Sequence, residues 1–232
     1  MKVIDAKKVF ADYTATQVKG IKNKPFSLRK ICVYEDVLAA FNDVYCSGII
    51  FPRRGRLAKR NNTPNVEIIL SSLAKKVYNY FSIKENGGIS KEEFDLFHNE
   101  LCTTFLDAIN VARQSVGYVS LNYGNAQKLI NIVFKYLACY SDYICYVKHF
   151  IWCHMPIDTI ILKWLKDNYN IREIRYSIYD DTLSASYKKK SWTSLDKIKY
   201  EELVNIIRNN VLADTRFAGL SVLDVEFVVW GE

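Results

Sequence analysis

The spacing of apolar residues is the feature that most limits the fold of this chain. Segment 65–82 has apolar residues every three or four positions, at Val66, Ile69, Leu70, Leu73, Val77 and Phe81. This is the period of one face of an α-helix. Similar spacing and end signals predict helices over 35–47, 90–114, 125–140, 142–153, 156–167 and 197–210. Segments 171–190 and 222–230 fit a helix or a strand, so the sequence predicts a mostly α, multi-helix globular fold.

Length and composition set the number of domains. The chain has 232 residues, half of them hydrophobic, with only 9 Gly and 4 Pro. Disordered chains lack this apolar content, and collagen-like chains need far more Gly and Pro. We expect one helical domain over 1–232. A second arrangement has an N-terminal subdomain, 1–85, docked on a core formed by 86–232.

The net charge indicates an anionic partner or simply a well-solvated surface. Lys and Arg number 32 against 25 Asp and Glu, a balance of +7. Two segments concentrate the cations, 53–60 and 188–190. Contacts from Lys and Arg to phosphates supply most sequence-independent affinity for nucleic acid. We therefore assign nucleic-acid contacts to Arg53, Arg54, Arg56, Lys59, Arg60, Lys188 and Lys189, with a solvated charged loop as the alternative for each cluster.

Cysteine spacing and the N-terminus indicate the compartment. None of the six Cys forms the closely spaced pair typical of structural zinc sites, so we expect no metal and no cofactor. The first residues lack the apolar run of a secretory signal. Charged residues interrupt the most apolar region, 129–164. These features predict a reduced cytoplasmic protein that does not act in a membrane.

Two lysines lie within the apolar helix predicted over 125–140. Lys128, Asn131 and Lys135 fall on one helix face, because residues three, four and seven apart align. Burial disfavours the charged form of an amine, and a neutral amine is a nucleophile that can form a Schiff base. The alternative is that both lysines extend along the helix to water.

An aspartate stands near the start of the next helix. Asp158 follows Pro156 by two residues, and Pro favours the first helical position. The positive end of the helix dipole would stabilise the Asp158 carboxylate. Two interpretations remain open: ordinary helix-start chemistry, or an anion fixed beside a reacting centre.

The pattern Lys128-x6-Lys135, followed by Pro156-Ile157-Asp158, resembles the archaeal 8-oxoguanine glycosylase branch of the helix-hairpin-helix base-excision DNA glycosylases. It is also similar to bacterial proteins with an 8-oxoguanine-glycosylase-like fold. The resemblance implies a helix-hairpin-helix-like core. It implies Lys128 as the Schiff-base nucleophile, Asp158 as its catalytic carboxylate and Lys135 as the second lysine.

The end of the chain extends the resemblance. The family ends with an acidic residue four positions before a Trp, and both contact the extruded base; Glu226 and Trp230 match this spacing. Beside the implied centre, Gln127, Asn131 and His154 are further candidates for substrate contact, with a structural role as the alternative for His154. Helix-hairpin-helix proteins usually hold a DNA phosphate with a Gly-rich hairpin, whereas no Gly occurs between 125 and 218. The grip on DNA is therefore expected to be atypical.

These features lead to three hypotheses: an enzyme, a binding module, and an RNA- or protein-binding helical regulator that has no base pocket. In the first, the protein is a DNA glycosylase and AP lyase of base excision repair that removes an 8-oxoguanine-like purine. In the second, the same fold is a non-catalytic module that binds nucleic acid or a modified base, for instance in defence against foreign DNA. The base, the strandedness of the DNA and the oligomeric state stay open.

Overall fold

The computed structural model describes residues 2–3, 5–9, 34–46, 66–83, 89–115, 117–140, 149–169 and 192–231. The longer helices are α2 (Tyr34–Cys46), α3 (Glu67–Ile83), α4 (Lys91–Gln114), α5 (Tyr123–Tyr140), α7 (Thr159–Tyr169), α9 (Lys197–Val211) and α10 (Val222–Gly231). Two short 3-10 helices, η1 (Trp192–Ser194) and η2 (Thr215–Phe217), flank α9. Within the described ranges there is no strand, which confirms the mostly α class.

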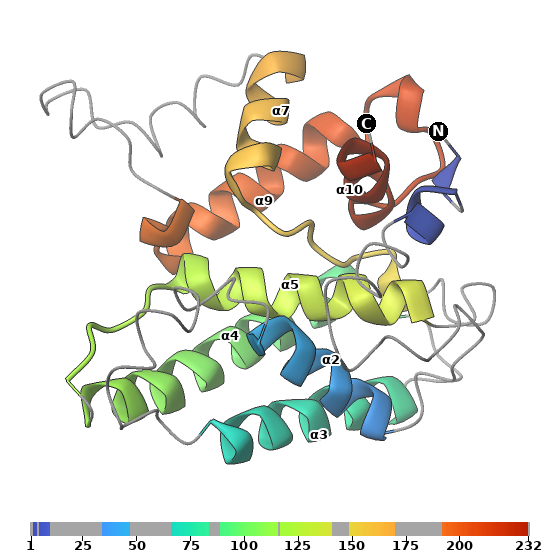
Figure 1. Cartoon of the computed structure of the whole chain (residues 1–232). Helices are drawn as coiled ribbons and strands as arrows, with labels where there is room; N and C mark the ends of the chain where they lie inside the picture. The colour runs from blue at the N-terminus through green and yellow to red at the C-terminus, as the bar shows by residue number, and fades with distance from the viewer. Residues whose placement is uncertain are drawn as a thin grey trace, which may run out of the picture.

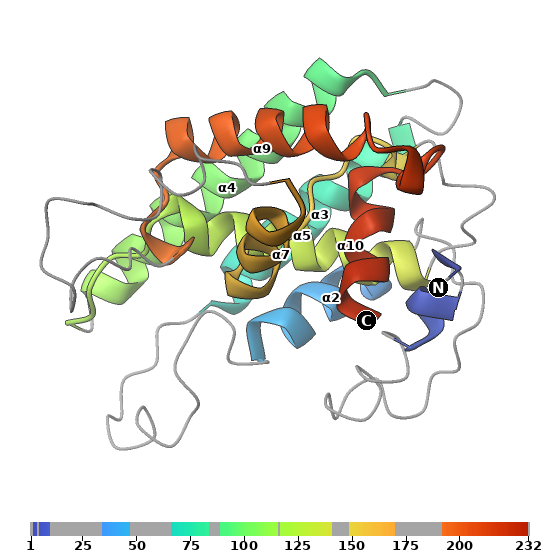
Figure 2. The same ribbon diagram turned by 90° about the horizontal axis from the view of Figure 1, so that it is seen from above.

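Helix α5 lies between two groups of helices. α2, α3 and α4 lie on one side of it, and α7, α9 and α10 lie on the other (Figure 1). The view from above shows the same order, with α5 beneath α7 and α10 (Figure 2). A helix in this position has neighbours on both sides, so it needs apolar side chains around most of its circumference.

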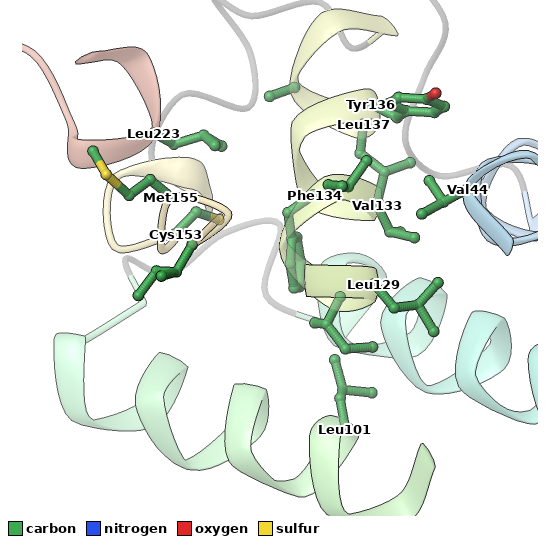
Figure 3. Packing of buried hydrophobic residues seen from close by; sticks show 14 of the residues in the cluster. Val44, Leu101, Leu129, Val133, Phe134, Tyr136, Leu137, Cys153, Met155 and Leu223 are labelled. Atoms are coloured by element: carbon green, nitrogen blue, oxygen red, sulfur yellow. The ribbon is translucent and has the colours of Figure 1, made fainter. Parts of the chain in front are cut away.

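The side chains of α5 meet this requirement. Leu129 and Val133 extend toward α2, where Val44 lies, and Phe134 faces the side of Cys153 and Met155 (Figure 3). All of these residues are buried. The ring of Phe134 also packs edge-to-face on that of Phe94 from α4, with 5.4 Å between centroids. Burial of such side chains contributes about 1.5–3 kcal/mol each, so α5 organises the core.

The start of α4 has the predicted capping box. Ser90 Oγ accepts from the backbone N–H of Glu93, and Glu93 Oε2 accepts from the N–H of Ser90, both at 3.1 Å. Two N–H groups at the helix start, which have no partner within the helix, are thereby satisfied. The sequence signal for this helix start is confirmed.

Two predicted helices end or begin elsewhere. The chain leaves the helical conformation after Phe150, so the helix predicted over 142–153 does not extend to 153; residues 141–148 lie outside the described part. The helix predicted from Pro156 begins at Thr159 instead. Gln127 binds the backbone of Ile157 on both its N–H and C=O, and residues 153–157 have no regular secondary structure. The ambiguous segment 222–230 is helical, and 171–190 is outside the described residues.

The first residues pack against the last helix. Lys7 Nζ lies 3.1 Å from Asp224 Oδ1 in a buried ion pair, and both termini lie near α10 (Figures 1 and 2). Burial lowers the pKa of Lys7, although the Asp224 charge opposes this. One hydrophobic cluster includes Ala6, α2, α3 and the helices that follow. The division into 1–85 and 86–232 stays a prediction.

Candidate active site

Lys128 is the exception on the buried central helix. From Tyr123 to Cys139 all residues of α5 except Lys128 are buried. The side chain of Lys128 keeps 13% of its surface exposed. The remaining surface of this helix is apolar or engaged with protein partners. The partly exposed Lys128 amine can therefore contact a ligand that binds from solvent, while the buried helix α5 holds the lysine in place.

Asp158 faces this amine from the start of α7. Its Oδ1 accepts hydrogen bonds from the backbone N–H groups of Ile160 at 2.9 Å and Ile161 at 3.0 Å. Its Oδ2 lies 3.2 Å from Lys128 Nζ. Asp158 is thus the N-cap of α7, and the helix N-terminus stabilises its negative charge. One oxygen fixes the carboxylate and the other is directed at the lysine.

A Trp side chain covers the same amine. Lys128 Nζ lies 4.5 Å from the centroid of the Trp192 ring, within the range of a cation–π interaction. Trp192 is half-buried and packs against the core. The sequence predictions missed this residue, because it follows a segment of ambiguous structure and is 64 positions from Lys128 (192 − 128). The one local signal was Gly124, which allows another backbone to approach α5 closely.

Lys135 and Glu226 form a second, buried ion pair. Lys135 Nζ lies 2.9 Å from Glu226 Oε1 and 2.6 Å from Oε2. The same ammonium lies 5.1 Å from the Trp230 ring and 5.0 Å from the Phe227 ring. Burial raises the pKa of Glu226, and the charge of Lys135 opposes the rise. The charges of Asp158 and Lys128 make smaller, opposing contributions to the pKa of Glu226.

Gln127 and Asn131 lie entirely inside the protein. Gln127 Nε2 donates to the carbonyl oxygens of Gly124 and Ile157, each at 2.9 Å, and its Oε1 accepts from the N–H of Ile157 at 3.2 Å. Asn131 Nδ2 donates to Gln127 Oε1 at 3.0 Å and to Tyr200 OH at 2.9 Å. Both side chains are 0% exposed. Their partners are protein groups, and the substrate contact predicted for them stays a prediction.

His154 belongs to the same buried network. Its Nδ1 lies 2.8 Å from Tyr200 OH, and its Nε2 lies 2.9 Å from Asp95 Oδ1. Arg208 donates to both Asp95 oxygens at 2.7 Å. Burial lowers the pKa of His154 to about 4, against the opposing effect of Asp95. Burial alone would raise the pKa of Asp95, but hydrogen bonds from His154 and Arg208 hold it well below its usual range. The network joins α4, α9 and the segment leading to Asp158.

The predicted DNA-contacting cations lie outside the described residues. This holds for Arg53, Arg54, Arg56, Lys59, Arg60, Lys188 and Lys189. Among residues that the structure does describe, no group of three or more His, Cys, Asp or Glu side chains could hold a metal ion. In the same part of the chain no helix is both long and apolar enough to span a bilayer.

Comparison with known proteins gives no relative for this arrangement. No family model, no curated protein and no solved structure matches the chain. The chemistry of the site therefore has to be argued from the side chains themselves.

Proposed function

We propose that this protein is a DNA glycosylase with AP lyase activity, which excises a damaged or modified purine of the 8-oxoguanine type. The observation that carries the proposal is the Lys128–Asp158 pair, 3.2 Å apart. It joins the one α5 amine that stays partly exposed to a carboxylate fixed at a helix N-terminus. The grouping of Lys135 with Glu226 and Trp230, two turns further along α5, also supports the helix-hairpin-helix-like core that the sequence resemblance implies.

The proposed reaction uses both members of the pair. Lys128 loses a proton to Asp158 or water, and its Nζ attacks the anomeric carbon of the damaged nucleotide. The glycosidic bond breaks, and its electron pair leaves with the base, which takes up a proton. The Asp158 carboxylate stabilises the positive charge that develops on the sugar. The sugar ring then opens: the C1′–O4′ bond breaks, O4′ takes up a proton, and the Nζ lone pair forms the C=N bond of the Schiff base. The Schiff base allows loss of a C2′ proton and elimination of the 3′ phosphate.

The surroundings supply the other requirements of such an enzyme. Enzymes that act on a base extrude it into a pocket and read its edge, and the Lys135–Glu226 pair with Trp230 would contact the base there. The basic segments 53–60 and 188–190 would bind the phosphates. We place the protein in the cytoplasm, consistent with the free and buried Cys102, Cys139 and Cys153.

Borohydride trapping tests the proposal. Wild-type protein is incubated with single-stranded and duplex oligonucleotides that contain either 8-oxoguanine or a pre-formed abasic site, and is then reduced. We expect a covalent adduct that disappears in Lys128→Ala and persists in Lys163→Ala, which removes an exposed lysine from the neighbouring α7. An adduct that survives in Lys128→Ala, or no adduct with any abasic-site DNA, would exclude a Lys128 lyase.

A further inference from the structure

Trp192 is held over Lys128 by a backbone contact as well as by its ring. A Cβ added to Gly124 would lie 2.0 Å from the Trp192 carbonyl oxygen, so only glycine allows η1 to approach α5 this closely. The N–H of Gly124 donates to the carbonyl oxygen of Leu195 at 2.9 Å. The N–H of Leu195 donates to the carbonyl oxygen of Trp192 at 3.2 Å. These contacts fix the position of η1 against the first turn of α5.

This contact directs Trp192 to the lysine face of the helix. Gly124 precedes Lys128 by four residues, and positions four apart share one helix face. The chain that touches Gly124 therefore passes over Lys128 as well. In Figure 1 the residues that lead into α9 lie beside the N-terminal end of α5. The nearness of Trp192 to the amine follows from how the two elements pack.

The chemistry of this neighbour matches that of a nucleobase. Trp192 is half-buried and packs against the core, and the centroid of its ring lies 4.5 Å from the Lys128 amine. The base of an attacked nucleotide is a planar group bonded to the same carbon that Lys128 would approach. Such a base stacks well on an indole ring, and stacking tolerates different bases because each has an aromatic face.

We propose that Trp192 is the aromatic wall on which the base of the bound nucleotide stacks at Lys128. It would form one side of the base site, while Trp230, over Lys135, belongs to the second ion pair. The inference rests on the proposed function in its choice of a nucleotide ligand. It adds a specificity-determining residue that the resemblance did not supply.

Binding to matched duplexes tests the inference. In each duplex the test position faces a tetrahydrofuran residue, so a base placed there has no pairing partner. The test position carries guanine, 8-oxoguanine, hypoxanthine or a second tetrahydrofuran. Competition between these duplexes for the protein gives the ratio of affinities with and without a base at this position. We expect the wild type to prefer at least one purine by about 5- to 150-fold, the range of one base–aromatic stack.

Four variants separate stacking from general damage. Trp192→Leu should lose the preference, and Trp192→Phe should keep most of it because a smaller aromatic face remains. Gly124→Ala should also lose it, since the added Cβ displaces η1. Trp164→Leu removes another half-buried Trp, whose ring packs on Tyr169 and Phe217, and should leave the preference unchanged.

The outcomes distinguish this inference from the proposed function. No purine preference in the wild type overturns the role of Trp192. So does a preference that survives in Trp192→Leu, or one lost equally in Trp164→Leu. A borohydride adduct with no Trp192-dependent preference leaves the lyase standing and removes the inference. A Trp192-dependent preference without any adduct keeps the base site and removes the catalytic proposal.

Discussion

Asp158 combines two tasks within one side chain. Oδ1 caps α7 through the N–H groups of Ile160 and Ile161, and Oδ2 meets the Lys128 amine. Capping requires an acceptor oxygen and no net charge, because Asn caps helices about as well as Asp. The proposed chemistry requires the negative charge. The two tasks can therefore be separated by substitution.

We expect Asp158→Asn to keep the stability of the protein and lose its activity. The amide oxygen still caps α7, so the free energy of unfolding should change by less than about 1 kcal/mol, the usual value of a cap. Loss of the carboxylate should slow release of 8-oxoguanine from DNA by about 100- to 1000-fold, as for other charge-stabilising groups. Urea denaturation and single-turnover kinetics measure the two effects.

Two further variants control this comparison. Asp158→Ala should lose activity and also the cap. Ser90→Ala removes the cap of α4 instead, and should lower stability by about 1 kcal/mol without affecting cleavage. Release of 8-oxoguanine at the wild-type rate by Asp158→Asn would show that the carboxylate charge has no part in breaking the glycosidic bond.

At the scale of single residues, the sequence could indicate candidate site residues more readily than the contacts between them. A spacing of seven placed Lys128 and Lys135 two turns apart on one helix. Their partners are 30 and 91 residues away, in Asp158 and Glu226, so local spacing carries no information on either pairing. Only the family resemblance grouped these four residues. No resemblance indicated Trp192, and its one local signal, Gly124, allows a close backbone approach without saying which residue makes it.

At the scale of elements, the spacing of apolar residues located the helices well. Each helix buries either one face or its whole circumference, and apolar residues mark the buried part. The ends were predicted correctly where local hydrogen bonds decide them, as in the Ser90–Glu93 box. The start of α7 was not, because tertiary bonds outweigh the preference of Pro for a first turn. The Gln127 carboxamide binds both backbone groups of Ile157, so these groups are not available to a helix that starts at Pro156.

We therefore expect Gln127→Met to disturb the site as well as the fold. Met has nearly the same volume but leaves the N–H and C=O of Ile157 buried without this partner. Such a loss costs about 1–3 kcal/mol per unsatisfied group. Because Gln127 adjoins Lys128 and Ile157 adjoins Asp158, cleavage by the folded fraction should also fall. Urea denaturation, and cleavage rates under conditions where the variant is folded, measure both.

Gln114→Met is the matched control, since Gln114 is exposed on α4 and binds Ser120. It should leave stability within about 0.5 kcal/mol of the wild type, as for most surface changes. If Gln127→Met were destabilised but cleaved DNA at the wild-type rate when folded, Gln127 would support the fold without positioning the pair.

At the scale of the whole molecule, a buried polar network links the layers around α5. Asp95 and His98 come from α4, Tyr200 and Arg208 from α9, and His154 from the segment before α7. His98 Nε2 lies 2.8 Å from Asn131 Oδ1 on α5 itself. Burial lowers the pKa of His98 well below its usual value, and the neighbouring His154 adds to this. Both rings are therefore neutral in the folded protein at neutral pH.

This network predicts that acid weakens the fold. Unfolded His binds a proton near pH 6.5, whereas folded His154 does so only near pH 4. Between these values the unfolded state holds more protons, so stability is present above about pH 6.5 and is lost as pH falls toward 4. Each such His can contribute up to about 1.4 kcal/mol per pH unit. The lowered pKa of Asp95 extends the loss to still lower pH.

Urea denaturation between pH 7.5 and 4.5 measures this dependence, and a variant assigns it. Glu226 acts in the opposite direction, because its raised pKa favours the folded state at low pH. The overall slope is therefore a sum, and the difference between the wild type and His154→Gln isolates one histidine. We expect the variant to have lower stability at pH 7 and a shallower decline toward pH 5. An equal decline in both proteins would show that His154 does not couple the layers to pH.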